Sequence, residues 1–399
     1  MPTSCGHYVD DRQQLRSSGG AAPRRADHLR RQRRCVSKLG AISLNHEVLK
    51  RDGRRPNAAH VFGPPDGLVP IVQGSAARGG NQRHDDPELF QTGRLGAVNA
   101  LGVTQYGQMT AGSFMYIGPQ GIVHGTTITV MNAFRKVLPK GDTPKGKIFL
   151  TAGLGGMSGA QPKAGNIANC ITVCAEVNPK AATKRHQQGW VDELIDSMPA
   201  LIARVKQAQA QQEVVSIAFI GNVVEVWEAF DAEDIFVHLG SDQTSLHNPW
   251  SGGYYPVGVS YDEANRLIRE EPEQFKAKVQ ETLKRHAAIV NKHTAKGTYF
   301  FDYGNAFLLE ASRAGGDVMA PNGIDFKYPS YVQDILGPMC FDYGFGPFRW
   351  VCTSGKAEDL DKTDAIAAQV LQRIMLESPE EIQQQMQDNI TWILDAKQN

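Results

Sequence analysis

One short stretch, Thr151-Ala-Gly-Leu-Gly-Gly-Met-Ser-Gly159, constrains the fold more than any other part of the chain. It lies between an apolar run at 147–150 and small residues at 160–168, the order expected for strand, glycine turn and helix. A second apolar run, 171–175, ends in Glu176. This layout is typical of a dinucleotide-binding βαβ unit. Its glycines let a pyrophosphate approach, its helix N-terminus attracts the charge, and an acid about 20 residues on accepts ribose hydroxyls.

The spacing of the glycines departs from the usual fingerprint. Gly153, Gly155 and Gly159 form G-x-G-x-x-x-G, and Ser158 stands where the third glycine usually falls. Two interpretations therefore remain: a turn that binds a dinucleotide, or a glycine-rich turn that binds nothing. The strand, the helix and Glu176 around the turn favour the first.

Apolar runs and amphipathic stretches alternate along the following residues. We expect strands at 214–220, 234–239 and 298–301. We expect helices at 122–138, 190–212, 223–230, 262–296 (divided near Pro272), 358–376 and 379–397. His286 falls on the apolar stripe of its helix, where packing is a simpler role than ligand binding. The alternation predicts an α/β fold with a doubly wound, mostly parallel sheet.

Polar segments follow the expected strands at 153–159, 221–222, 242–247 and 302–305. The carboxyl ends of parallel strands meet at one edge of a sheet, and ligands of open α/β sheets bind beyond that edge. We therefore expect these four segments to share one site.

The bulk composition excludes several classes of protein. Lys and Arg number 42 and balance 42 Asp and Glu, so no overall field favours nucleic acid or an anionic membrane. No apolar run approaches the ~20 residues that span a bilayer. The six cysteines form no C-x-x-C pair and the histidines share no ligand spacing, so we expect a reduced, cytoplasmic setting and no metal.

Arginine-rich residues 1–95 suggest either a segment that does not fold or a nucleic-acid arm or targeting peptide.

The candidate site offers mostly neutral polar groups. Glu176 suits ribose hydroxyls and disfavours a 2′-phosphate, which favours NAD over NADP. Neutral donors and acceptors that suit an amide or phosphates, or that simply cap loops, are Gln108, Asn222, Gln243 and Thr244. Tyrosines that could contact a planar ligand, or only pack, are Tyr254, Tyr255 and Tyr303.

Three further residue types leave their roles open. His247 is either a general acid or base or an ordinary loop histidine. Arg349 could clamp a substrate carboxylate, or form a cation–π contact with its aromatic neighbours. Cys340 and Cys352 have no histidine or helix N-terminus beside them in sequence, so inert thiols are expected.

Five motifs together resemble the urocanase family, in its order and with similar spacing. They are Tyr106-Gly-Gln-Met-Thr-Ala-Gly-Ser113, Thr151-Ala-Gly-Leu-Gly-Gly-Met-Ser-Gly-Ala-Gln161, Ser241-Asp-Gln-Thr-Ser245 with His247-Asn-Pro249, Asp302-Tyr-Gly-Asn305 and Gly346-Pro-Phe-Arg-Trp350. The resemblance runs from about residue 100 to the C-terminus and is closer to the animal-type branch than to the bacterial one.

The resemblance implies a lyase that hydrates urocanate to 4-imidazolone-5-propanoate in histidine degradation. It implies tightly bound NAD⁺ that acts as an electrophile rather than as a redox shuttle, in a cytoplasmic homodimer. It assigns Arg349 to the substrate carboxylate. The residues it assigns to NAD⁺ are Gln108, Gly156, Met157, Ser158, Glu176, Asn222, Val223, Gln243, Thr244, Ser245, Leu246, His247, Tyr254, Tyr255 and Tyr303.

The chain also departs from the family pattern. A family arginine shortly after the ribose acid falls near Ala181, so that contact is expected to be absent or to move to Lys180 or Lys184. The family's N-terminal Tyr-Gly-Gly loop has no counterpart in 1–95. Neither Cys340 nor Cys352 occupies the position of the bacterial active-site cysteine, and that segment of the family is absent.

The resemblance divides the chain into four expected parts. These are an atypical N-terminal region (1–98), a remnant of the N-terminal core (99–120), a Rossmann-like NAD domain (121–328), and the start of a mixed C-terminal core domain (329–399), with truncation at both ends. Two rival functions follow. One is a catalytically inactive NAD-binding fragment or pseudoenzyme; the other is an ordinary NAD-dependent dehydrogenase, which only the shared nucleotide motif supports.

Overall fold

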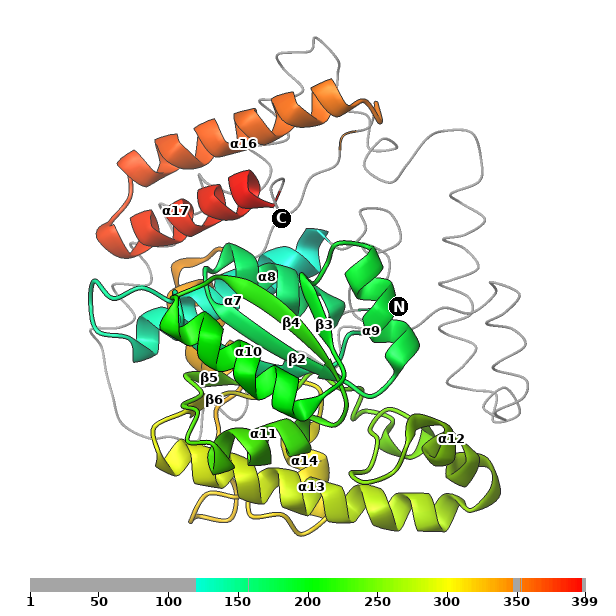
Figure 1. Cartoon of the computed structure of the whole chain (residues 1–399). Coiled ribbons are helices and arrows are strands. Elements are labelled where there is room, and N and C mark those ends of the chain that lie inside the picture. The colour runs from blue at the N-terminus through cyan, green and yellow to red at the C-terminus, as the bar shows by residue number, and fades with distance from the viewer. Residues whose placement is uncertain (1–119, 157, 347–351, 353, 397–399) are drawn as a thin grey trace, which may run out of the picture.

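The structure is a computed structural model that describes residues 120–396, except 157, 347–351 and 353. Its centre is a six-stranded parallel sheet in the order β3-β4-β2-β1-β5-β6 (Figure 1). The strands are β1 (Ile148–Ala152), β2 (Ile171–Glu176), β3 (Glu193–Ile195), β4 (Val215–Ile220), β5 (Leu239–Gly240) and β6 (Tyr299–Phe300). The parallel sheet confirms the fold class expected from the sequence.

Helices cover both faces of the sheet. The N-terminal ones are α7 (Gln120–Val137), η3 (Ser158–Ala160), α8 (Gln161–Ile167), α9 (Pro179–Gln187), α10 (Met198–Ala210) and α11 (Val223–Ala232). After β5 come η4 (Pro249–Ser251), α12 (Tyr261–Glu270), α13 (Pro272–Ala295), α14 (Phe307–Arg313) and the π-helix η5 (Val332–Leu336). The last are α15 (Gly337–Met339), η6 (Phe341–Tyr343), α16 (Ala357–Leu376) and α17 (Glu380–Asp395).

Alternation along the strands builds two core layers. Ile148 and Leu150 of β1 belong to one cluster with α10, α11 and α13, whereas Phe149 packs with α7 on the opposite face. Successive side chains of a strand point to opposite faces, and all five residues of β1 are buried. Burial on both faces is the reason why these strands are continuous apolar runs in the sequence.

Two expectations about local structure were wrong. The helix expected at 190–212 is the short strand β3 followed by α10, because Pro199 cannot occupy a helix interior and instead lies in the first turn of α10. The strand expected at 234–239 is only the two-residue β5, which pairs with β1 and β6 at Leu239 and Gly240. Directly before it, the His238 N–H donates to the Ile148 carbonyl (3.0 Å) and the His238 carbonyl accepts from the Tyr299 N–H (3.1 Å). Ile235 and Val237 are buried but lie outside the strand.

The helical hairpin α16–α17 packs on α7 through an apolar cluster that includes Val123, Met386 and Trp392, and α17 adds polar contacts. Asn132 and Gln385 exchange side-chain hydrogen bonds of 3.0 and 2.7 Å. Arg135 donates two hydrogen bonds of 2.9 Å to Asp388. The buried Asn132–Gln385 pair and the partly exposed Arg135–Asp388 pair fix the register between helices that lie about 250 residues apart in sequence.

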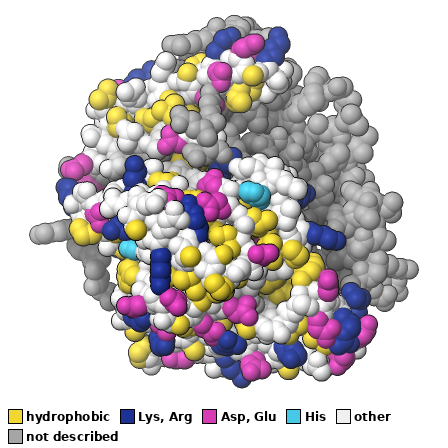
Figure 2. Space-filling view, viewed as in Figure 1, with side chains coloured by type: hydrophobic (Ala, Val, Ile, Leu, Met, Phe, Trp, Pro, Cys, Tyr) yellow, Lys and Arg dark blue, Asp and Glu magenta, His cyan; other side chains and the backbone are white. Residues whose placement is uncertain are grey.

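Charged side chains of both signs alternate over α12 and α13 (Figure 2). Arg266, for example, pairs with three glutamates close to it in sequence, Glu263, Glu270 and Glu271. This face therefore carries no field of a single sign. Within the described residues no helix is long and apolar enough to cross a membrane.

Candidate dinucleotide site

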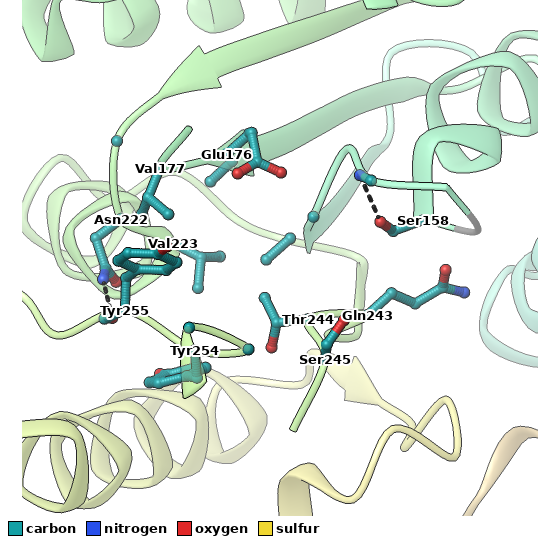
Figure 3. Close-up of a pocket in the computed structure, with 17 residues that line it drawn as sticks. Ser158, Glu176, Val177, Asn222, Val223, Gln243, Thr244, Ser245, Tyr254 and Tyr255 are labelled. Carbon is teal, nitrogen blue, oxygen red and sulfur yellow. Dashed lines mark hydrogen bonds between the residues drawn. The ribbon is translucent and has the colours of Figure 1, made fainter. Parts of the chain in front are cut away.

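A cavity opens beyond the carboxyl ends of β1, β2, β4 and β5 (Figure 3). The chain runs from β1 to β2 and then to the edge strand β3, places β4 between β2 and β3, and returns to the other side of β1 to form β5 and β6. The cavity thus lies at the point where the strand order reverses, the usual ligand site of open α/β sheets. Its lining consists of Ala152, Gly153, Gly155, Ser158, Ala175, Glu176, Val177, Gly221, Asn222, Val223, Gln243, Thr244, Ser245, Gly252, Gly253, Tyr254 and Tyr255.

The glycine turn after β1 is held by its own hydrogen bonds. The Gly153 N–H donates to the carbonyl of Ala175 (2.8 Å), and the Gly155 N–H donates to Ser158 Oγ (2.9 Å). Gly153 has φ of +94°, and a Cβ there would lie 2.9 Å from Ser158 Oγ and 3.1 Å from the Gln243 carbonyl. Only glycine fits this position, which brings the turn close to the loop after β5.

Glu176 joins the end of β2 to the glycine turn. Its carboxylate accepts hydrogen bonds from the Leu154 N–H (2.7 Å) and the Asn178 N–H (2.9 Å). Burial raises the pKa of this carboxyl, and the backbone N–H groups partly offset the rise. Each carboxylate oxygen keeps a further lone pair, so ribose hydroxyls could still donate to it.

Asn222 has a structural role that accounts for both of its polar atoms. Its Oδ1 accepts from the Val224 N–H (3.0 Å) and caps α11, and its Nδ2 donates to the Tyr255 carbonyl (2.9 Å). The loop-capping alternative therefore describes its side chain, which fixes the loop that carries Tyr254 and Tyr255 against α11. Figure 3 shows Asn222, Val223 and Tyr255 together on one side of the cavity.

A buried carboxylate, Asp242, organises the loop after β5. Its Oδ1 accepts from the Thr244 N–H (3.0 Å), Thr244 Oγ1 (2.5 Å) and Asn305 Nδ2 (2.7 Å). Burial raises the pKa of Asp242 to about 6. Its Oδ2 is buried and accepts no hydrogen bond from the described residues. The sequence named Asp242 only as part of the segment 242–247, and its contact with Asn305, 63 positions away, has no local signal.

Nine of the residues named from the sequence line this one cavity: Ser158, Glu176, Asn222, Val223, Gln243, Thr244, Ser245, Tyr254 and Tyr255. Four others do not: Gly156 and His247 are exposed, Leu246 is fully buried in the core, and Tyr303 stacks on Tyr331 with ring centroids 4.6 Å apart. Gln108, Met157 and Arg349 lie outside the described residues.

His286 packs in the core, as expected. It is fully buried on α13, and its Nδ1 lies 3.0 Å from the Tyr254 hydroxyl. Burial lowers its pKa from 6.5 to about 3. Since the cavity wall carries Tyr254, neutral His286 helps to keep that wall in place.

We predict that His286 makes folding sensitive to acid. A folded pKa below the unfolded value gives stability that is complete above pH 6.5 and is lost as the pH falls towards 3. Urea denaturation measures the fall in the free energy of unfolding between pH 7 and pH 5. This fall should be about 2 kcal/mol smaller in His286→Gln than in the wild type. The control His186→Gln, at an exposed position of α9, should keep the wild-type pH dependence. Equal pH dependence of His286→Gln and the wild type would refute this assignment.

The sheet, the glycine turn and the cavity at the reversal of strand order define a Rossmann-like α/β domain. Comparison with known families identifies the particular family within this class. Residues 118–335 match the urocanase Rossmann-like domain, and residues 338–399 match the urocanase C-terminal domain. The chain belongs to the urocanase family.

Curated relatives agree with this assignment. The chain is 53% identical over 305 residues to a probable urocanate hydratase of Caenorhabditis elegans and 55% identical over 302 residues to one of Dictyostelium discoideum. It is 52% identical over 305 residues to the urocanate hydratase of Homo sapiens. These matches take in 74–75% of this chain, but the chain spans only 44–45% of the relatives' length.

Proposed function

We propose that this chain is the NAD⁺-binding part of a urocanate hydratase, which adds water to urocanate to give 4-imidazolone-5-propanoate in histidine degradation. The observation that carries the proposal is the 2.7 Å hydrogen bond between Glu176 and the Leu154 N–H, which brings the ribose acid and the phosphate turn to one cavity. Family membership supplies the reaction.

The cavity suits NAD⁺ in the chemistry of its lining. Two glycines of the lining lie so close to neighbouring segments that neither could carry a side chain. A Cβ on Gly153 would lie 2.9 Å from Ser158 Oγ, and one on Gly253 would lie 2.1 Å from the Ser245 carbonyl. Glu176 would receive the ribose hydroxyls and disfavour the extra phosphate of NADP⁺. The uncharged side chains of residues 243–245 suit an amide such as nicotinamide.

Bound NAD⁺ would supply an electrophilic ring towards which the imidazole of urocanate can donate electrons. The chain's own residues bind and orient: the turn and Glu176 fix one half of the cofactor, and residues 243–245 with Tyr254 and Tyr255 fix the other. Arg349 is proposed to hold the substrate carboxylate. We extend the cofactor site to Gln108, Gly156, Met157, Leu246, His247 and Tyr303 on the resemblance alone. A cytoplasmic homodimer completes the proposal.

Two rival functions are separable by experiment. A non-catalytic NAD-binding fragment would bind NAD⁺ and leave urocanate unchanged, and a dehydrogenase would form NADH. Because the chain spans less than half of its relatives' length, we predict that the purified chain binds NAD⁺ but shows little loss of the ultraviolet absorbance of urocanate. A full-length relative serves as the positive control.

The outcomes of this assay decide between the functions. Brisk loss of urocanate absorbance would contradict the expected lack of turnover while supporting the family's activity for this chain. Accumulation of NADH with a hydroxy substrate would instead favour the dehydrogenase. If the chain restores turnover to a relative from which the matching region has been deleted, the chain is a competent part of the enzyme.

A further inference from the structure

An arginine of α9 lies against the glycine turn and is not one of the residues that line the cavity. Arg185 Nη2 donates to the Gly155 carbonyl (2.7 Å) and its Nε donates to the Leu154 carbonyl (3.2 Å). Nη1 donates to Gln188 Oε1 (3.0 Å), and the guanidinium lies over the Trp190 ring, 5.5 Å from its centroid. All three nitrogens are therefore engaged and the group is held in place.

Arg185 occupies the space beside the third glycine of the motif. A Cβ on Gly159 would lie 2.5 Å from Arg185 Nε, 3.0 Å from its Cζ and 3.2 Å from its Cδ. These are the three nearest atoms, and Gly159 does not have a positive φ. An alanine at position 159 would therefore have to displace the guanidinium, so glycine at this position leaves the space in which Arg185 lies and does not serve an unusual backbone conformation.

The turn is thus held from two sides with opposite charge. Glu176 and Ser158 accept the N–H groups of Leu154 and Gly155, while Arg185 takes the carbonyls of the same two residues. Arg185 is not among the residues that line the cavity, so these carbonyls are directed to a group outside it. Carbonyl oxygens turned towards a phosphate would repel it, and a cation behind the turn attracts it.

We propose that Arg185 is a positioning residue for the pyrophosphate of the dinucleotide, acting through the carbonyls of Leu154 and Gly155. The inference rests on the proposed function, since it concerns the same cofactor. The sequence suggested Lys180 or Lys184 for a basic contact in this region, but both are exposed and Arg185 makes the contacts with the turn.

The test compares ligands with and without phosphates. Arg185→Ala should weaken binding of NAD⁺ and of ADP about tenfold, because two charge-assisted hydrogen bonds to the turn are lost, and should leave adenosine binding within twofold. Arg185→Lys should restore part of the loss. Lys184→Ala, next to it on α9, is the matched control and should bind like the wild type.

Gly159→Ala provides a second, independent variant. Its methyl group should displace Arg185 and so reproduce the tenfold loss, and the double variant Gly159→Ala/Arg185→Ala should be no worse than either single variant. Melting temperatures from circular dichroism identify any variant that fails to fold. Additive losses, or an equal loss for adenosine, would overturn the inference.

The design separates this inference from the proposed function. If the wild-type chain binds neither NAD⁺ nor ADP, the proposed function fails and the inference falls with it. If the wild type binds both and Arg185→Ala binds them equally well, only the role of Arg185 is refuted.

Discussion

Replacing Gly165 with alanine is expected to lower the free energy of unfolding by about 3 kcal/mol. Gly165 lies on α8 where that helix packs directly on β2, and a Cβ there would lie 1.7 Å from Thr172 Oγ1 and 2.9 Å from Thr172 Cβ. A β-branched side chain in a buried strand has little freedom to move away, so α8 itself must shift. Urea denaturation measures the loss.

The same substitution should also weaken the cofactor site. Gln161 at the start of α8 donates to the carbonyls of Ala152 (3.1 Å) and Gly153 (3.3 Å), so a displaced helix releases the end of β1. Thr172→Ala in the Gly165→Ala background should recover part of the stability. As a control, Gly156→Ala adds a methyl group with no atom within 4 Å and should unfold like the wild type. Wild-type stability of Gly165→Ala would contradict the close packing of α8 on β2.

The second large effect is expected at Glu176. Glu176→Gln should raise the dissociation constant of NAD⁺ roughly 10- to 100-fold, since an amide offers one acceptor oxygen where the carboxylate offers two. Either the Leu154 or the Asn178 N–H then loses its acceptor, and the ribose loses a charged partner. Calorimetric titration with NAD⁺ measures the change.

Selectivity gives a sharper form of the same experiment. Removing the negative charge should reduce the preference for NAD⁺ over NADP⁺, because the 2′-phosphate is no longer repelled. Glu281→Gln, at an exposed position of α13, is the matched control and should leave both affinities unchanged. If Glu176→Gln binds NAD⁺ as tightly as the wild type, the ribose assignment is wrong.

Much of the fold could be predicted because its signals are local. The strands β1, β2 and β4 are buried on both faces and therefore form continuous apolar runs, and α13 carries a clear apolar stripe. The strand β3 was missed because it has only three residues, all of them partly exposed, directly before the helix signal of α10. Short edge strands depend on their neighbours more than on their own sequence.

The candidate site was predictable to the extent that its residues follow strands. Glu176 was found because the βαβ pattern fixes its position along the chain, and Ser158 was named from the resemblance to the urocanase family. The contacts of Arg185 with a turn 30 positions away, and of Asp242 with Asn305, have no local signal. Leu246 is the reverse case, a residue that the sequence assigns to the site although its side chain packs in the core.

The proposed cofactor site is tested most directly by calorimetric titration of the purified chain with NAD⁺ and, separately, with NADP⁺. We predict that one NAD⁺ binds per chain and that NADP⁺ binds at least about tenfold more weakly, because the proposed place of Glu176 beside the ribose sets its charge against a 2′-phosphate. Absence of NAD⁺ binding by a folded chain, or equal affinity for the two dinucleotides, would contradict this prediction.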